Sequence, residues 1–388
     1  MIPFEPKRVF ISVAEDSADV HGASLLRAAA DRLPHCRFYG LTGPRMRDAG
    51  AETLYDFTAH AAMLAGVLSV IRHAREAVRI VRQSWQEQPP DLVVLLDSPE
   101  LHLRLASRAR QLGLPVLYYI APQTWASRAY RNRRIARDVD RLACILPFEE
   151  EYFRQAGVNA EFVGHPLFEA LARQQPDKAE VRRLRSGDGP LLALLPGSRR
   201  HVIDAMLPRQ LDVIRQLRAR GLAVRAAVSC ARPERAEQIQ RHIQTAGLPI
   251  EVIAGGNATL LTAADAALVA SGTATFEVAH YGTPMVVMYD AGGLLAWPYR
   301  LFGRWVITSP HLALVNVLAG ARVVPEFMPF VPDTRPIADT TARLLSDESW
   351  RTSMRQQLTE LTAPLTKSAA SARVCALIQE LLETAAQG

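Results

Sequence analysis

Two short turns in the second half of the chain combine glycine with hydroxyl or cationic residues, a pattern suited to holding phosphate. Ser271-Gly272-Thr273 follows the apolar run Ala267–Ala270 and opens a helix-length segment. Pro196-Gly197-Ser198-Arg199-Arg200 follows the apolar run Leu191–Leu195 and precedes a longer helical pattern. The first N–H groups of a helix lack partners, and a guanidinium adds paired hydrogen bonds to an anion. Together the turns predict a diphosphate site, although each alone also suits a tight connection.

Carboxylates accompany these turns and also follow a strand in the first half. Glu277 lies one turn into the helix after Thr273, where it can accept hydrogen bonds from sugar or ribose hydroxyls. Asp97 ends the apolar run Leu92–Leu96. At the carboxyl end of a strand, a carboxylate is well placed to act as a general base on an attacking hydroxyl. An Asp before Ser-Pro suits a helix N-cap equally well, so both interpretations stay open.

Further polar residues of the first half lie after other strands. Glu15, Ser17 and Asp19 belong to the turn that follows Val9–Val13, and His165 follows Glu161–Val163. His165 is a candidate for chemistry, and a structural role beside proline is the alternative.

Strand and helix patterns alternate along the chain, which is typical of parallel sheets covered on both faces. The sequence predicts strands at Val9–Val13, Arg37–Leu41, Leu92–Leu96, Val116–Ile120, Arg141–Ile145, Glu161–Val163, Leu191–Leu195, Ala223–Val228, Ile250–Ile253, Ala267–Ala270 and Met285–Tyr289. The charged stretch Arg173–Pro190, broken by Pro and Gly, is interpreted as an interdomain linker. We therefore expect an α/β fold of two Rossmann-like, doubly wound parallel-sheet domains, residues 1–175 and 190–345, facing a central cleft. Residues 346–388 are expected to form the last helices of the chain. One alternative is that these helices cross back to the first domain.

Composition excludes several other classes of protein. The 388 residues are 49% hydrophobic and 22% charged, which is ordinary globular usage. Four widely spaced cysteines indicate neither a zinc site nor a disulfide framework and suit a reducing cytoplasm. We expect neither a secretory leader nor a membrane-spanning helix. The net charge of +6 favours anionic partners, but the arginines lack the interleaved aromatics of a nucleic-acid platform, so no nucleic acid is expected.

Nine motifs, in matching order, resemble the lipid-A-disaccharide synthase family. They are VAEDSADVHG (Val13–Gly22), GPRMRDAG (Gly43–Gly50), LLDSPELH (Leu95–His102), YIAPQTWASR (Tyr119–Arg128), LPFEEEYF (Leu146–Phe153), VGHPL (Val163–Leu167), LPGSRR (Leu195–Arg200), SGTATFEVAHYGTPMVVMY (Ser271–Tyr289) and NVLAGARVVPEF (Asn316–Phe327). The resemblance implies a GT-B glycosyltransferase that joins UDP-2,3-diacylglucosamine to 2,3-diacylglucosamine 1-phosphate. Such an enzyme inverts the anomeric carbon and releases UDP, with no metal and no other cofactor.

The resemblance also assigns roles to individual residues. Asp97 matches the family's catalytic base. The acceptor side is expected to include Glu15, Ser17, Asp19 and His165. The nucleotide-sugar side is expected to include Gly197, Ser198, Arg199, Ser271, Gly272, Thr273, Glu277, Asn316 and Glu326.

Some positions depart from the family pattern and put the identity of the substrate in question. Ala14 and Ala18 stand where glycines are usual, so a Cβ there could narrow the acceptor turn or bar a positive φ. Val202 replaces an acidic residue and His102 replaces an asparagine. Acyl-chain specificity and oligomeric state stay open.

Two other functions remain alternatives at this point. One is a different GT-B enzyme using UDP-GlcNAc or a lipid acceptor, such as an epimerase or lipid glycosyltransferase. The other is a non-catalytic protein that binds a nucleotide sugar or a lipid phosphate.

An amphipathic pattern over Met63–Gln86 predicts a long helix with an apolar face and an arginine face. Since acylated substrates reside in a bilayer, this helix could rest peripherally on the cytoplasmic face of the inner membrane. The alternative is an ordinary helix covering the sheet. The apolar run Ala61–Ile71 is the better candidate for membrane contact.

Overall fold

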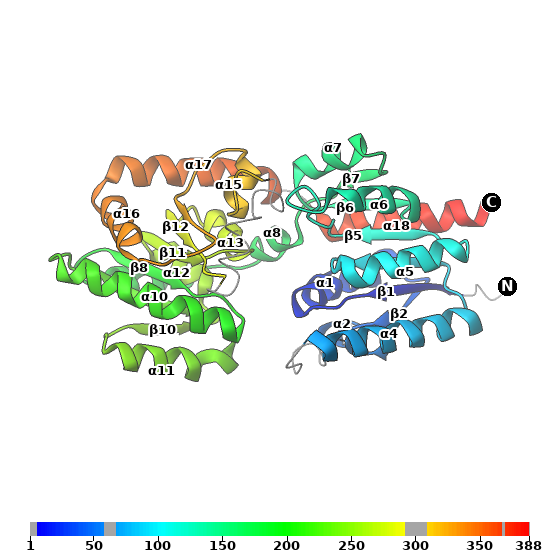
Figure 1. The fold of residues 1–388 in the computed structure, drawn as a ribbon, viewed down its shortest axis with the longest axis horizontal. Helices are drawn as coiled ribbons and strands as arrows, with labels where there is room; N and C mark the ends of the chain where they lie inside the picture. The colour runs from blue at the N-terminus through cyan, green and yellow to red at the C-terminus, as the bar shows by residue number, and fades with distance from the viewer. Residues whose placement is uncertain (1–5, 58–66, 292–308, 367–368, 388) are drawn as a thin grey trace. The chain divides into compact units, whose positions relative to one another are not determined.

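The chain folds into two compact units, each with its own parallel sheet (Figure 1). The computed structural model describes residues 6–57, 67–291, 309–366 and 369–387. Unit 1 contains Met1–Glu169 and Ser368–Gly388, and unit 2 contains Ala170–Lys367.

Within the described residues, the sheet of unit 1 has seven strands in the order β3-β2-β1-β4-β5-β6-β7, and each neighbouring pair is parallel. Its strands are β1 (Lys7–Ser12), β2 (Cys36–Leu41), β3 (Glu52–Tyr55), β4 (Leu92–Leu96), β5 (Val116–Tyr119), β6 (Arg141–Cys144) and β7 (Ala160–Phe162). Its helices are α1 (Asp16–Arg32), α2 (Pro44–Asp48), α4 (Val67–Glu87), α5 (Pro99–Gln111), the short 3-10 turn η1 (Ala129–Arg131), α6 (Asn132–Asp138), α7 (Pro147–Gln155), α8 (Pro166–Leu171), which runs into unit 2, and α18 (Ala370–Gln387).

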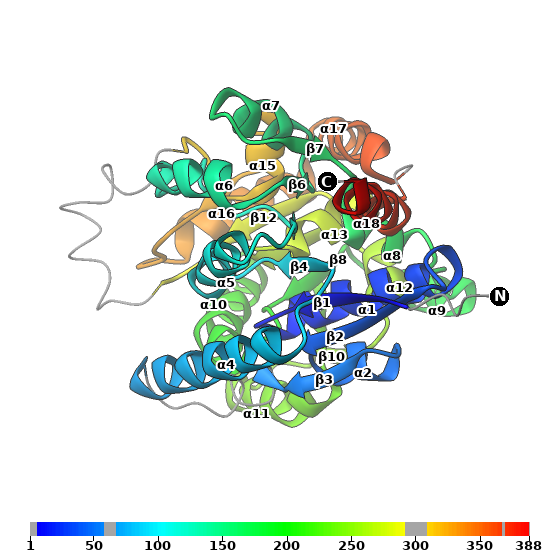
Figure 2. The same ribbon diagram turned by 90° about the vertical axis from the view of Figure 1, so that its right-hand side faces the viewer.

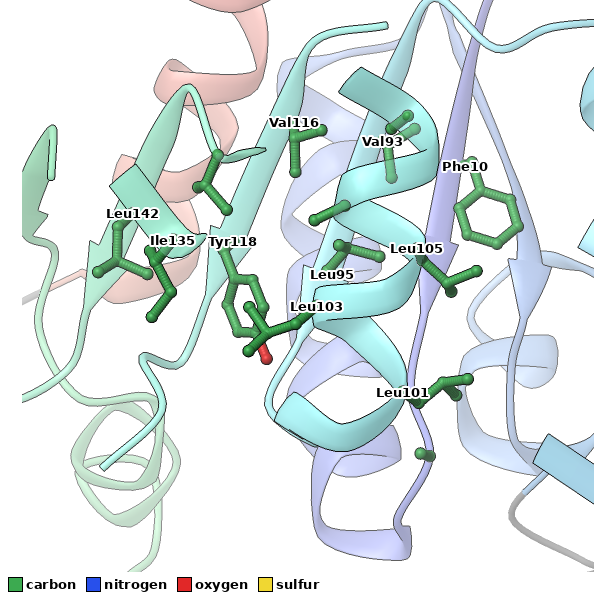
Figure 3. Close-up of a cluster of buried hydrophobic side chains, with 14 of the residues drawn as sticks. Phe10, Val93, Leu95, Leu101, Leu103, Leu105, Val116, Tyr118, Ile135 and Leu142 are labelled. Carbon is green, nitrogen blue, oxygen red and sulfur yellow. The ribbon is translucent and has the colours of Figure 1, made fainter. Parts of the chain in front are cut away.

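Alternation of side chains along each strand builds a separate core on each face of this sheet. Phe10 and Leu95 belong to the cluster under α4, α5 and α6, whereas Val9 and Ile11 belong to the cluster under α1 and α18. Figure 3 shows the first cluster, in which Leu101 and Leu105 of α5 lie over the sheet. Both faces are therefore buried, as expected for parallel strands with continuous apolar sequences.

The C-terminal helix α18 completes unit 1 rather than unit 2. Its buried residues Val374, Leu377 and Ile378 join the core that α1 covers, and Figure 2 shows α18, in red, near α1. Ser371 donates from both its backbone N–H and its hydroxyl to the carboxylate of Glu169. The last helix thus fills part of the first unit's core.

Within the described residues, unit 2 has six parallel strands in the order β10-β9-β8-β11-β12-β13. Its strands are β8 (Leu191–Leu195), β9 (Arg225–Cys230), β10 (Glu251–Ala254), β11 (Ala266–Ala270), β12 (Met285–Met288) and β13 (Glu326–Phe327). Its helices include α9 (Lys178–Arg185), α10 (Arg200–Ala219), η2 (Pro233–Arg235), α11 (Ala236–Ala246), α12 (Asn257–Ala263), α13 (Ala274–His280), α15 (Leu314–Ala319), α16 (Arg335–Ser346) and α17 (Glu348–Thr366).

The stretch interpreted from sequence as a linker contains the helix α9. Asp177 caps this helix by accepting from the N–H groups of Ala179 and Glu180. Leu184 is buried, and the helix packs on α12 of unit 2. The charged residues that suggested a linker form the solvent-facing side of an amphipathic helix.

Two sequence motifs of unit 1 meet at Asp19, which is fully buried in α1. Its carboxylate accepts hydrogen bonds from the backbone N–H groups of Gly43, Arg45 and Met46 at 3.0–3.1 Å. These N–H groups lie at the start of α2, where an anion also interacts favourably with the helix dipole. A Cβ at Gly43 would lie 2.4 Å from Asp19 Cγ, so glycine is required for this approach.

We expect Asp19→Ala to destabilise unit 1 by roughly 2–4 kcal/mol, because it leaves three buried or partly buried N–H groups unpaired. Chemical denaturation followed by circular dichroism measures this loss. The matched control is Asp16→Ala, whose exposed carboxylate pairs with Arg45 at 2.5 Å and should cost less than about 1 kcal/mol. An Asp19→Ala protein of unchanged stability would contradict the capping role.

Candidate functional site

Four loops that contain predicted site residues lie at the topological switch points of the two sheets. They are the loops after β1, β4, β8 and β11. In unit 1, β1 and β4 are neighbours although β2 and β3 come between them in sequence, and Ser12 is in register with Leu95. In unit 2, β8 and β11 are neighbours in the same way, and Leu195 is in register with Val269. The chain leaves such paired strands in opposite directions, which opens a crevice for ligands at their carboxyl ends.

Asp97 lies in a left-handed turn directly after β4. Its φ is 55°, and that of Ser98 is 47°. The carbonyl oxygen of Asp97 accepts hydrogen bonds from His102 Nδ1 at 2.6 Å and from the Tyr118 hydroxyl at 2.5 Å. The residue at the N-cap position of α5 is Ser98, one position after Asp97.

The protonation states of the two groups that hold this carbonyl follow from their burial. Burial lowers the pKa of His102 to about 4, so its ring is neutral near pH 7. Because a carbonyl only accepts, Nδ1 carries the proton and Nε2 accepts from the Ser12 hydroxyl at 2.8 Å. Burial, and then the charge of Asp97, raise the pKa of Tyr118 well above its ordinary value, which keeps the phenol a donor.

Asp97 itself is half-buried and lines a pocket of about 260 Å³ within unit 1. The other residues of the lining are Pro99, Glu100, Pro122, Gln123, Thr124, Ser127, Arg128 and Arg131. Asp97 therefore borders open space at the carboxyl edge of the sheet. Sequence reasoning did not select Glu100, Arg128 or Arg131, although Arg128 ends one of the nine motifs.

The turn after β1 divides its residues between surface and interior. Glu15 and Ser17 are exposed at the start of α1, whereas both oxygens of Asp19 are used at the start of α2. Ala14 and Ala18 have no positive φ, so alanine fits the backbone at these positions without strain. Asp19 is thus placed to shape the turn, while Glu15 and Ser17 lie at its surface.

His165 is buried in the loop between β7 and α8. Its Nδ1 accepts from the N–H of Leu167 at 3.2 Å, and its ring packs edge-on against Phe168. Burial lowers its pKa to about 3, with a smaller contribution from the nearby His21, whose own pKa burial lowers to about 4. These interactions suit a neutral ring that supports the loop.

In unit 2 the turn after β8 requires glycine for two reasons. Gly197 has a φ of 97°, and a Cβ there would lie 2.8 Å from Val202 Cγ1. Ser198 is half-buried and Arg199 is exposed at the N-cap of the long helix α10. Gln210 of this helix donates to the carbonyls of Leu195 and Leu268, which joins the helix to both strands of the switch point.

The turn after β11 has open space beside its glycine backbone. Gly272 has a φ of 118°, and a Cβ at this position would meet nothing within 4 Å. Thr275 turns inward, where its hydroxyl donates to the Gly272 carbonyl at 2.8 Å. Ser271 is half-buried and Thr273 is exposed. The turn leaves room for a group to approach its backbone.

Glu277 is held by two residues that sequence reasoning missed. Asn257 Nδ2 donates to both oxygens of Glu277, at 3.1 and 3.3 Å, and the Ser229 hydroxyl donates to Asn257 Oδ1 at 2.5 Å. Burial raises the pKa of Glu277, and the hydrogen bond from Asn257 acts in the opposite direction. Asn257 opens α12 after β10, so a polar residue following a strand was the available signal.

Asn316 and Glu326 build one loop together. Asn316 is fully buried, and its side-chain amide bonds to the backbone N–H groups of Val323 and Val324 and to the Val324 carbonyl, each at 2.9 Å. Glu326 Oε2 accepts from the N–H of Ala313 at 2.7 Å, just before α15. Both side chains are placed to shape this loop, since the Asn316 amide and Glu326 Oε2 bond to its backbone, while Glu326 Oε1 lies 3.6 Å from His311 Nδ1.

No group of three or more His, Cys, Asp and Glu side chains in the described residues is arranged to hold a metal ion.

Comparison with known proteins identifies the family. The family model for Lipid-A-disaccharide synthetase matches residues 9–379. The Lipid-A-disaccharide synthase of Myxococcus xanthus is 35% identical over 383 residues, covering 97% of this chain and 98% of the relative. That of Nitrosococcus oceani is 37% identical over 353 residues, covering 90% of each. The resemblance drawn from the nine motifs is thereby confirmed.

Solved structures with low sequence identity share the fold. The glycotransferase of kitacinnamycin has a TM-score of 0.65 at 16% identity, covering 97% of this chain and 99% of that chain. The MnaA–UDP structure from S. aureus has a TM-score of 0.66 at 13% identity, covering 97% of each. The expected fold class is confirmed as a two-domain, Rossmann-like GT-B fold. With a family match across nearly its whole length, the chain belongs to the lipid-A-disaccharide synthase family.

Proposed function

We propose that this glycosyltransferase joins UDP-2,3-diacylglucosamine to 2,3-diacylglucosamine 1-phosphate, forming lipid A disaccharide 1-phosphate and UDP. Membership of the family supports this reaction over an epimerase or a non-catalytic binding protein. The observation that carries the mechanism is the left-handed turn that sets Asp97 at the edge of a pocket. The catalytic residues and the membrane contact below are part of the same proposal.

In this mechanism Asp97 acts as the general base. Its carboxylate takes the proton of an acceptor hydroxyl while that oxygen attacks the anomeric carbon of the donor. The bond from this carbon to the diphosphate breaks, and its electron pair leaves with UDP. Attack from the side opposite the leaving group inverts the anomeric carbon.

Unit 2 supplies the leaving-group site in this proposal. The backbone of the turns at Gly197–Arg199 and Ser271–Thr273, with the Arg199 guanidinium, binds the diphosphate and stabilises its developing charge. Glu277 accepts hydrogen bonds from the ribose hydroxyls. The MnaA structure contains UDP on the same fold, which supports a nucleotide site. Asn316 and Glu326 act by holding the loop at α15 in shape.

Replacing Asp97 by Asn should lower kcat by roughly 10²–10⁴-fold with little change in UDP affinity, because only the base is lost. UDP release from the two acylated substrates measures the rate. Asp48→Asn, which alters an exposed carboxylate on α2, is the matched control and should keep full activity. A fully active Asp97→Asn enzyme would refute the role of the base.

If Glu277 binds the ribose as a carboxylate, UDP binding should depend on pH. Since burial raises its pKa, acidification should protonate Glu277 and weaken binding at a higher pH than for an exposed glutamate. Asn257→Ala removes the hydrogen bond that lowers this pKa, so the acid limb should shift to still higher pH. Calorimetric UDP titrations at successive pH values measure the shift.

Glu277→Gln is the control for this experiment, because it leaves only the titration of UDP itself. Both the wild-type protein and Asn257→Ala should differ from that baseline. If the three proteins share one pH profile, Glu277 does not contact the nucleotide in its ionised form.

A membrane-facing role for α4 is also part of the proposal. Ala77, Val81 and Trp85 are buried against the sheet, while Arg72, Arg75, Arg79 and Arg82 are exposed. The part of the helix with described side chains, residues 71–87, therefore covers the sheet and presents a cationic face. Most of the apolar run Ala61–Ile71 lies outside the residues whose side chains are described, and Ile71 is 42% exposed. Among the described residues, no helix is both long enough and apolar enough to span a membrane.

Arg75→Glu with Arg82→Glu should reduce sedimentation with anionic vesicles by roughly tenfold or more, since each arginine near such a surface contributes about 1 kcal/mol. The wild-type interaction should weaken as salt is raised. Arg27→Glu with Arg37→Glu changes the net charge equally at exposed positions away from α4 and is the control. Equal loss in both double variants would show that net charge alone decides binding.

A further inference from the structure

We propose that the pocket beside Asp97 is a subsite for a phosphate monoester, with Arg128 and Arg131 as its cations. In the reaction proposed above, on which this inference rests, the monoester is the anomeric phosphate of the acceptor. The same pocket would then hold the acceptor's sugar headgroup between its phosphate and the hydroxyl that Asp97 deprotonates.

The two guanidinium groups are already gathered at one wall of this pocket. Glu100 Oε1 accepts from Arg128 Nη1 at 2.5 Å and from Arg131 Nη2 at 2.9 Å, and Glu100 Oε2 lies 2.8 Å from Arg131 Nη1. A guanidinium carries five N–H donors, so this carboxylate orders both groups without using all of them. Such preordering lowers the entropy cost of binding an anion.

The exposed fractions of the three side chains indicate which of the two ion pairs a ligand can replace. The side chains of Glu100 and Arg128 are 63% and 53% exposed, whereas that of Arg131 is 17% exposed. An ion pair between two exposed side chains contributes little to stability, so a phosphate can replace Glu100 as the partner of Arg128. Phosphate has the larger charge and a third oxygen, which favours it over the carboxylate.

The backbone around the pocket is strained in a way that ordinary surface loops are not. Across the described residues, the non-glycine residues with positive φ are Asp97, Ser98, Ile120 and Arg128. All of them lie after β4 or β5, and two of them line this pocket. Left-handed backbone is unfavourable at such residues and concentrates at functional sites. The strain sets the base and one cation around the same space.

A residue in the wall of the pocket has a buried hydroxyl group without a hydrogen-bond partner in the part of the chain that the structure describes. Thr124 is 2% exposed and lines the pocket, and its hydroxyl makes no hydrogen bond within the described residues. Buried hydroxyl groups are normally paired, so the wall of this pocket contains an exception. At about 260 Å³, the space falls below the roughly 300–1,000 Å³ of pockets that enclose a drug-sized ligand. It suits a headgroup whose acyl chains lie outside.

The test compares acceptors with and without the phosphate, 2,3-diacylglucosamine 1-phosphate and 2,3-diacylglucosamine, using the full-length enzyme. The wild-type enzyme should prefer the phosphorylated acceptor in kcat/KM. Arg131→Ala and Arg128→Ala should each reduce this preference by roughly 10–100-fold, because each removes a charge-assisted contact to phosphate. The ratio does not depend on how much of a variant is folded and active.

Further variants and the two acceptors distinguish a failure of the phosphate subsite from a failure of the proposed reaction. Arg131→Lys retains the charge and should restore part of the preference, while Arg104→Ala, at an exposed position of α5 outside the pocket, should leave it unchanged. A wild-type enzyme that transfers to both acceptors equally, or arginine variants with undiminished preference, would overturn the subsite alone. A wild-type enzyme that transfers to neither acceptor would overturn the proposed reaction.

Discussion

Two hydrogen bonds to one carbonyl oxygen hold the turn on which the chemistry proposed for the first unit depends. His102 and Tyr118 donate to the backbone oxygen of Asp97, while Asp97 and Ser98 adopt left-handed backbone. Left-handed backbone costs about 1–2 kcal/mol per residue, and a buried hydrogen bond returns about 1 kcal/mol. The two bonds therefore offset part of the strain at these two residues. Because His102 is neutral, the Ser12 hydroxyl can fix its ring from the far side.

The two units share one topological feature, a switch point in the sheet, but present different groups there. Each places its loops at a switch point between two neighbouring strands, β1 and β4 in one sheet and β8 and β11 in the other. In unit 1 the loops present a carboxylate beside paired arginines. In unit 2 they present open glycine backbone, with Glu277 braced by Asn257. This difference suits a base and an acceptor on one side of the reaction and a diphosphate on the other.

The interior strands and the switch-point loops could be predicted from sequence because buried parallel strands are continuous apolar runs that stop at polar turns. The edge strands β3 and β13 were missed. Residues of β3 are mostly half-exposed and β13 has two residues, so neither carries such a run. The helix α9 was missed because its charges resemble those of a linker.

The roles of individual side chains were harder to predict, because they depend on contacts between distant segments. Asp19 lies beside exposed Glu15 and Ser17 in sequence, yet its carboxylate is committed to N–H groups 24 to 27 residues away. Asn316 matches a binding motif, yet its amide is committed to its own loop. Arg131 and Asn257 lie outside the motifs, and only the folded chain brings them to a pocket residue and to Glu277.

A structure of the enzyme with UDP and the acceptor would test directly whether the turn at Asp97 serves the transfer. The mechanism predicts that the reacting hydroxyl lies about 2.6–3.2 Å from an Asp97 carboxylate oxygen, the range over which a base can take a proton. A hydroxyl bound instead to another carboxylate, with that of Asp97 directed away from the acceptor, would contradict it.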